Sequence, residues 1–359
     1  MRELIRIGTS YSHTRILKVM SIICRFAYDH DGEIIPTIDL SKIDSKVVSE
    51  IGQKYRRKEA VYNDYLKTSE AMGLLSTRKV PRYRLTDYGL LAVAGLDNNE
   101  LSVFPLTSFE KAFYLQLLMR KDIDYLVPIL SALHGFPELV EDALDVLFSD
   151  RSRLGPLIDI RSIFRKELSE RIEQLHLAAE GMELRSTISR WERRTLNHRV
   201  SSRLFWLVEI LSERELVMQD KEKAVQTFLR KTERLRDTLL ELDFSFGSDL
   251  VVDEQFPRIY LKTHRQKPGR EVNESLIQGE ILNTIEKEWD RYSKLEPDIF
   301  GNRISALPFL LTTQIRLVLQ NVEVPLSRIR LVFQKRMPNR GFILVWRDDF
   351  HSGFIERNN

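Results

Sequence analysis

Apolar residues recur at helical spacing along most of this chain. In residues 13–27, Ile16, Val19 and Ile23 share one face, which predicts a helix with one buried side. The same spacing predicts further helices over residues 44–51, 58–72, 109–118, 154–242, 273–289 and 312–320. The pattern therefore predicts a mainly α fold with a few short strands.

A short hairpin interrupts the helical pattern after residue 72. Gly73 is expected to end the preceding helix, because glycine adopts the left-handed backbone conformation without strain. Residues 74–77 and 82–85 then form two predicted strands, with residues 78–81 at the tip. Thr86 is expected to cap another short helix, since its side chain can accept a hydrogen bond from a first-turn N–H.

The last sixty residues are predicted to contain two helices and a strand. Residues 312–320 form the first helix, and Pro325 suits the first turn of a second one over 326–337. Residues 342–346 form a strand. A rival interpretation makes residues 328–331 a strand that pairs with 342–346. Both fit the periodicity, and we favour the helix.

Three predictions concern the middle of the chain. Residues 258–262 have the pattern of a strand. Pro128, Gly135 and Pro137 are expected to separate short helices that continue to about residue 148. Two interpretations fit residues 185–246: plain amphipathic helices, which we favour, or a degenerate copy of the helix-and-hairpin pattern of residues 54–77, with a short strand at 215–217.

Residues 54–89 hold the most specific pattern in the sequence. They start basic, pass through a Met-Gly-Leu-Leu turn and close with a Tyr-x-Leu-Thr-x-x-Gly motif. The named residues of these two motifs are Met72, Gly73, Leu74, Leu75, Tyr83, Leu85, Thr86 and Gly89. With the positively charged wing between them, they resemble the winged helix-turn-helix superfamily, over residues 13–98 only. The resemblance implies a domain that binds DNA, or one that docks onto proteins in a multisubunit machine.

Of these two implied roles, the charge pattern favours DNA binding. An α-helix fits the major groove of B-DNA, which is about 12 Å wide, and residues near the helix start reach the base edges. Cations on a wing suit phosphate or minor-groove contact. The predicted DNA-binding residues lie on the helix start, the helix body and the wing: Lys54, Arg56, Arg57, Lys58, Tyr62, Asn63, Lys67, Arg78, Lys79, Arg82 and Arg84.

A chain of 359 residues is too long for one small domain. We expect a multidomain protein that is mainly α with short β-wings. The expected segments are a winged helix-turn-helix domain in 1–98, an acidic helical domain in 99–184, the helical segment in 185–246, a strand-plus-helix connector in 247–297 and a C-terminal winged-helix-like domain in 298–359.

The net charge of +3 is small but unevenly distributed. Residues 99–150 hold three basic and nine acidic side chains, whereas residues 1–98 hold sixteen and twelve. Residues 256–270 and 326–347 hold five and six basic side chains and no acidic ones. Because exposed charges are screened beyond about 8–10 Å, local sign matters more than the sum. We expect basic faces to meet DNA and the acidic, apolar block at 99–150 to meet a protein partner.

Composition indicates a globular protein. At 43% hydrophobic and 30% charged residues the chain can bury real cores. Cys24, the single cysteine, lies in an apolar run and is expected to be a core residue. We find no pattern of a signal peptide in residues 1–10 and no membrane span. We therefore expect a soluble cytoplasmic protein and no membrane partner, with homo-oligomerisation left open.

The sequence lacks the local signatures of common catalytic sites. It has no GxxxxGK[ST] and no GxGxxG loop, and its seven histidines are scattered. We therefore expect no catalytic residue, no metal and no cofactor. Two groups of residues were considered as metal or nuclease sites and set aside on their spacing and position: Asp348, Asp349 and His351, and Asp249, Glu254 and Lys262.

These observations favour a DNA-binding protein without chemistry of its own. Its size suits a DNA-binding or scaffold subunit of a larger DNA-processing or antiviral defence complex, bound to double-stranded DNA. Two alternatives remain: a sequence-specific transcriptional regulator, and a nuclease-type enzyme whose active site is not recognisable in the sequence.

Overall fold

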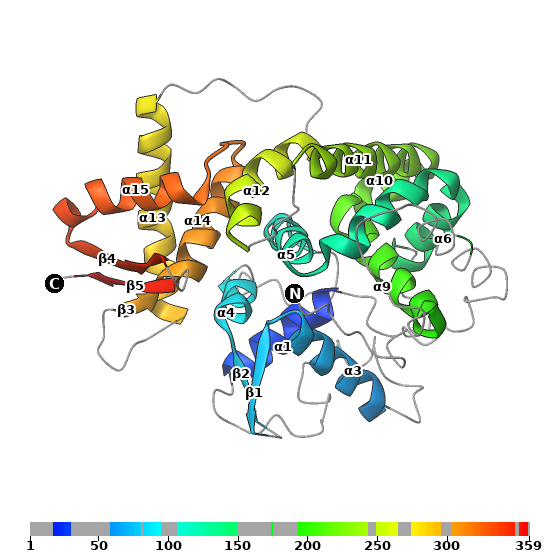
Figure 1. The fold of residues 1–359 in the computed structure, drawn as a ribbon, viewed down its shortest axis with the longest axis horizontal. Helices are drawn as coiled ribbons and strands as arrows, with labels where there is room; N and C mark the ends of the chain where they lie inside the picture. Colours follow the sequence, from blue (N-terminus) through cyan, green and yellow to red (C-terminus); the bar gives the residue numbers. More distant parts are fainter. Residues whose placement is uncertain are drawn as a thin grey trace.

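In the computed structural model the chain is mainly helical, with one two-stranded and one three-stranded antiparallel sheet (Figure 1). The predicted mainly α fold with short strands is therefore confirmed, while the predicted helix over 44–51 lies outside the described residues. No helix in the described part is both long and apolar enough to cross a membrane. The structure describes residues 17–29, 58–79, 82–94, 106–148, 174, 193–242, 249–264, 274–295, 303–348 and 352–357.

The N-terminal part combines three helices with a hairpin in the predicted order. Gly73 has the left-handed φ of 75° that ends its helix. The two strands pair antiparallel, with Leu75 opposite Leu85. The elements, which we call the hairpin unit, are α1 (Leu17–Asp29), α3 (Lys58–Ala71), β1 (Leu75–Lys79), β2 (Arg82–Leu85) and α4 (Asp87–Ala94).

Helix α5 (Ser108–Ala132) lies at the centre of the molecule (Figure 1). It begins with a capping box, in which the Glu110 N–H donates to the Thr107 hydroxyl (3.1 Å) and the Thr107 N–H donates to the Glu110 carboxylate (2.8 Å). The prediction that Pro128 separates short helices is wrong, because Pro128 lies inside α5. The helical dihedrals are broken at Asp122 instead, and packing against neighbouring helices on several sides keeps the proline within the helix.

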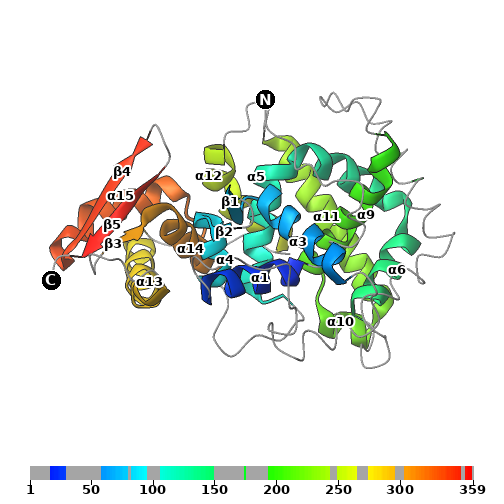
Figure 2. The ribbon, with the colours of Figure 1, turned by 90° about the horizontal axis from the view of Figure 1, so that it is seen from below.

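Four helices gather at one end of the molecule, on the right in Figures 1 and 2. They are α6 (Pro137–Phe148), α9 (Arg193–Leu211), α10 (Arg214–Gln219) and α11 (Lys221–Glu241), and the short 3-10 helix η2 (Leu133–Gly135) precedes them. The wing strand predicted at 215–217 is wrong, because these residues lie in α10. Three residues are too few to distinguish strand from helix periodicity. Asp220 then caps α11 by accepting a hydrogen bond from the Lys223 N–H (3.0 Å).

Helix α12 (Asp249–His264) corrects the strand predicted over 258–262. Pro257 lacks the N–H that would normally bond to the Asp253 carbonyl one turn earlier. The Gln314 side-chain amide donates to that carbonyl instead (2.8 Å), so the proline is accommodated by a tertiary hydrogen bond. The buried apolar residues of α12 recur at intervals of three and four: Val252, Phe256 and Ile259.

The C-terminal part packs three helices on one side of the three-stranded sheet, whose order is β3-β5-β4. The helix predicted over 326–337 is confirmed, so the rival strand at 328–331 is wrong. The elements, which we call the C-terminal unit, are α13 (Glu274–Leu295), β3 (Arg303–Ser305), α14 (Ala306–Leu319), α15 (Leu326–Arg336), the 3-10 helix η5 (Pro338–Arg340), β4 (Phe342–Arg347) and β5 (Ser352–Arg357).

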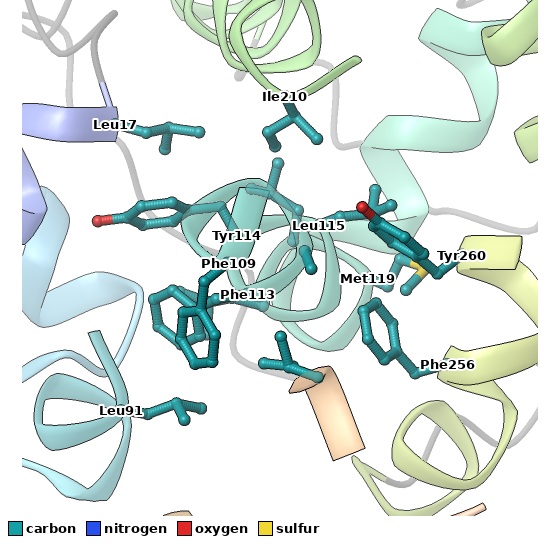
Figure 3. Packing of buried hydrophobic residues seen from close by; sticks show 14 of the residues in the cluster. Leu17, Leu91, Phe109, Phe113, Tyr114, Leu115, Met119, Ile210, Phe256 and Tyr260 are labelled. Atoms are coloured by element: carbon teal, nitrogen blue, oxygen red, sulfur yellow. The ribbon is translucent and has the colours of Figure 1, made fainter. Parts of the chain in front are cut away.

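One hydrophobic cluster joins both units through α5. Figure 3 shows Leu17 of α1, Leu91 of α4, Ile210 of α9 and Phe256 of α12 around the aromatic and aliphatic side chains of α5. Helix α4 also packs against α13 and α14, so the hairpin unit and the C-terminal unit are in direct contact.

Three buried ion pairs attach neighbouring helices to α5. Each brings a side chain of α5 together with an oppositely charged side chain that is at least 81 positions away in the sequence. Breaking such a pair by removing one partner typically costs about 3–5 kcal/mol, since the other charge is left buried. The pairs are Lys18–Glu110 (2.7 Å), Arg120–Asp253 (2.6 Å) and Arg203–Asp122 (2.7 Å).

Candidate nucleic-acid interface

Thr86 joins the three elements at the base of the hairpin. Its hydroxyl lies within hydrogen-bond distance of the carbonyl oxygens of Gly73 and Leu74, and it accepts the Gly89 N–H (3.1 Å). The Thr86 N–H also donates to the Leu74 carbonyl (3.1 Å). The end of α3, the start of β1 and the first turn of α4 are therefore tied to a single residue.

Gly89 fits this arrangement because it has no side chain. A Cβ atom at position 89 would overlap the Leu74 carbonyl oxygen and the Leu85 side chain. The motif that carries the winged-helix resemblance is therefore largely a folding motif. Thr86 does cap α4, as predicted, but its contacts to Gly73 and Leu74 were missed, because the sequence alone does not show which carbonyls a hydroxyl will face.

The hairpin collects basic residues at fixed positions. The register sets Lys79 opposite Arg82 and Ser76 opposite Arg84, with an irregularity between Thr77 and Lys79. Arg82 and Arg84 share a face because strand residues alternate with a period of two. Arg78 lies on β1, and the Arg84 side chain is exposed. The structure thus brings all four predicted wing cations together on one hairpin.

Helix α3 carries the predicted residues of the helix body. It begins at Lys58, and Tyr62 and Asn63 lie in its second turn. Lys67 is exposed, one turn after Asn63 on the same face. Tyr65 and Leu66 are buried against the rest of the unit. Three further residues of the prediction lie outside the described residues: Lys54, Arg56 and Arg57.

Other basic stretches of the chain are partly neutralised by carboxylates. Arg258 and Lys262 both approach the Glu241 carboxylate, at 3.6 and 2.7 Å. In the C-terminal unit, Arg330 pairs with Asp348 (2.7 Å). By contrast, Lys67 and Arg84 of the hairpin unit form no ion pair with any residue that the structure describes. The hairpin unit is therefore the better candidate for binding an external anion.

The start of α15 is likewise bound by a carboxylate of this chain. The Glu254 carboxylate of α12 accepts hydrogen bonds from the Ser327 N–H and hydroxyl, both at 2.8 Å. The backbone N–H groups at a helix start favour anions. In α15 an internal carboxylate already occupies part of that position.

Helix α5, which is part of the acidic block at 99–150, uses two of its carboxylates inside the chain. Glu110 and Asp122 are buried and paired with Lys18 and Arg203. The apolar side chains of α5 are likewise buried inside this chain. The apolar side chains and two carboxylates of α5 are therefore engaged inside the chain. Among the side chains that the structure describes, the exposed acidic ones of the block lie on α6: Glu138, Glu141 and Asp145.

The described residues do not assemble a recognisable catalytic centre. No group of three or more potential metal ligands occurs among them. Glu254 and Lys262, which we considered for a nuclease site, engage different partners, Ser327 and Glu241. Burial raises the pKa of the Cys24 thiol far above its ordinary value, so the thiolate nucleophile is strongly disfavoured.

Comparison with family models, with curated proteins and with solved structures finds no match to this chain.

Proposed function

We propose that this chain is a non-catalytic protein that binds double-stranded DNA through its hairpin unit. The observation that carries the proposal is the β1–β2 hairpin, which concentrates four basic residues between Arg78 and Arg84. Like charges at opposed positions, such as Lys79 and Arg82, destabilise a hairpin by themselves. Phosphate groups of a DNA backbone would offset that repulsion.

The proposed contact has α3 in the major groove and the hairpin on the adjacent backbone. The exposed Lys67 and the position of Asn63 one turn earlier are consistent with a helix that presents this face to DNA. Asn63 would read a base edge, since asparagine can form two hydrogen bonds with adenine. The hairpin cations would fix the orientation on the duplex without reading sequence.

We further propose that the C-terminal unit is a second winged helix. Its order of helix, tight connection, helix and strand is the order on which that prediction rests. In the structure, β5 pairs with this strand, β4, and β3 adds a third strand. The Glu254 carboxylate already accepts a hydrogen bond from the backbone at the start of the unit's helix α15. We therefore assign this unit a structural role and no DNA contact.

We propose that the protein serves as a DNA-binding or scaffold subunit of a larger DNA-processing or antiviral defence complex. DNA binding would use only the hairpin unit, which is a small part of the chain. The remaining helices pack together around α5. A protein partner would meet the exposed acidic side chains of α6 in preference to the buried α5.

A DNA-binding assay over a series of salt concentrations tests the proposal. The variant Arg56→Ala/Arg57→Ala/Lys58→Ala removes three cations at or just before the start of α3. Each lost phosphate contact should make the slope of log K against log salt shallower by about 0.9. An unchanged affinity and slope would refute the assignment of α3. The matched control Arg230→Ala/Arg234→Ala changes charge on α11 and should leave the slope as in the wild type.

A further inference from the structure

The hairpin unit raises the question of what holds a two-stranded hairpin in one orientation. Isolated two-stranded hairpins are marginally stable in water. The β1–β2 hairpin belongs to no larger sheet in the described structure. Its base, where the buried Leu75 faces Leu85, packs on the neighbouring helices, while Lys79 and Arg82 pair at its far end. Its direction must therefore be set at the base.

Thr86 is the residue at that base with contacts on both sides. One set of hydrogen bonds reaches Gly73 and Leu74, where the chain leaves α3 and enters β1. The other bond comes from the Gly89 N–H in the first turn of α4. Gly73 has a left-handed backbone, and the Leu74 N–H donates to the Ser69 carbonyl (2.8 Å), so the backbone sets where the chain leaves α3 while the Thr86 hydroxyl joins this exit to α4.

Helix α4 in turn is fixed in the core. Leu91 is buried in the cluster around α5 (Figure 3), and α4 packs against α1, α13 and α14. The Arg120 guanidinium lies 4.5 Å from the centre of the Tyr88 ring and is itself bound to Asp253. Thr86 thus connects the hairpin base to a helix that is packed in the core.

We propose that Thr86 is the positioning residue for DNA binding: its hydroxyl holds the β1–β2 hairpin at the angle to α3 at which both elements contact one duplex. This inference rests on the proposed function. Without the hydroxyl, the hairpin cations remain in the sequence but no longer reach the backbone at the same time as α3. The effect on DNA binding therefore comes through geometry, with no change in charge.

The test uses the full chain and a random-sequence DNA duplex. The variant Thr86→Val keeps the shape and removes the hydroxyl. Binding is measured over a salt series, and a stoichiometric titration counts the DNA-competent fraction, so that the slope refers to folded molecules. We expect a slope shallower by about 1.8, equivalent to two lost phosphate contacts. Thr86→Ser, which keeps the hydroxyl, should restore the wild-type slope.

Thr312→Val is the matched control. The Thr312 hydroxyl is buried and bonds to the Pro308 carbonyl (2.9 Å) and to the Tyr292 hydroxyl (3.0 Å) in the C-terminal unit. Its loss should lower the unfolding midpoint and leave the slope unchanged. If Thr86→Val does not fold, Thr86→Cys, whose thiol is a weaker donor, should give an intermediate slope.

The possible failures are distinguishable. A wild-type chain that does not bind DNA refutes the proposed function itself. A wild type that binds, together with folded Thr86→Val of unchanged slope, overturns the positioning role and leaves the proposed function standing. A slope that stays shallow in Thr86→Ser also overturns it, because the hydroxyl would then not be the cause.

Discussion

The hairpin unit and the C-terminal unit have similar elements but different electrostatic surroundings. Each has a helix that leads into an antiparallel hairpin, and each contains a glycine at a point of close backbone approach, Gly89 and Gly353. In the hairpin unit, Arg84 has no ion-pair partner within the described chain. In the C-terminal unit, Arg330 and the start of α15 are bound to carboxylates of the same chain.

The difference shows that basic composition alone does not identify an anion-binding surface. Residues 326–347 contain six basic residues and no acidic one, yet two of the six pair with carboxylates outside the stretch: Arg330 with Asp348 and Arg340 with Glu286. If the proposed function holds, a comparable stretch should bind DNA only where such partners are missing. Four predictions test this contrast and the buried contacts of helix α12.

The largest effect is expected at the buried ion pair between Arg120 of α5 and Asp253 of α12. Asp253→Ala leaves the Arg120 guanidinium buried without its carboxylate and should destabilise the protein by about 3–5 kcal/mol. Chemical denaturation followed by circular dichroism measures the loss. Both units should unfold in one transition, because they share a core. Two separate transitions, with one of them unchanged, would show that the units are independent.

Glu286→Ala, which breaks the exposed pair with Arg340, is the control and should change stability by less than about 1 kcal/mol.

The next effect concerns pH and helix α12, which packs against α5, α11 and the C-terminal unit. Burial, together with the nearby Lys231 and Lys111, lowers the pKa of His264 to about 4. The unfolded chain binds this proton at higher pH than the folded one. Stability should therefore be complete above about pH 6.5 and fall, by up to about 3 kcal/mol, as the pH drops towards 4.

Thermal unfolding over this pH range, compared between wild type and His264→Gln, isolates the contribution of His264. The variant should show a flatter dependence on pH between 6.5 and 4.5. Parallel curves for the two proteins would mean that His264 titrates normally in the folded chain.

The two glycines give a matched pair of smaller effects. Gly89→Ala and Gly353→Ala each force a Cβ against a backbone carbonyl, of Leu74 and Val345 respectively. Each should destabilise the protein by about 1–3 kcal/mol. Gly89→Ala should also weaken DNA binding, whereas Gly353→Ala should not. Equal effects on DNA binding would remove the distinction between the units. Gly279→Ala in α13, with open space around it, should be neutral or slightly stabilising.

The smallest effect is expected at the start of α15. Glu254→Ala removes the acceptor for the Ser327 N–H and hydroxyl and should cost about 1 kcal/mol, as for a lost helix cap. The salt dependence of DNA binding should not change, because the neighbouring helix α12 remains in place. A steeper slope in this variant would reveal α15 as a DNA-binding surface that Glu254 normally blocks.

Local chemistry made the hairpin unit and the second helix of the C-terminal unit predictable from the sequence. Gly73 ends α3 and Thr86 caps α4 through residues next to them in the sequence, and Pro325 precedes the start of α15, whereas the bonds from Thr86 to Gly73 and Leu74 were not predictable. The wrong strand prediction over 258–262 has the opposite cause, a contact between residues that are distant in the sequence. Pro257 stays in a helix because Gln314, 61 positions away from Asp253, supplies the missing donor.

The candidate site was only partly predictable. The cations of the hairpin are visible in the sequence, and their common location follows from the hairpin itself. The neutralisation of other cations, such as Arg258 and Lys262 by Glu241 or Arg330 by Asp348, depends on how distant elements pack. The burial of Glu110 and Asp122 likewise depends on partners from α1 and α9, so the sequence does not show that these two acidic residues of the block are internal.

The most direct test of the central claim compares two triple variants in one salt-series DNA-binding experiment. Lys79→Ala/Arg82→Ala/Arg84→Ala removes hairpin cations, and Lys335→Ala/Arg336→Ala/Arg347→Ala removes the same number from the C-terminal unit. The slope of log K against log salt should become shallower by about 2.7 in the hairpin variant and stay at the wild-type value in the C-terminal variant. An unchanged slope in the hairpin variant, or an equal loss in both, would contradict the assignment of DNA binding to the hairpin unit.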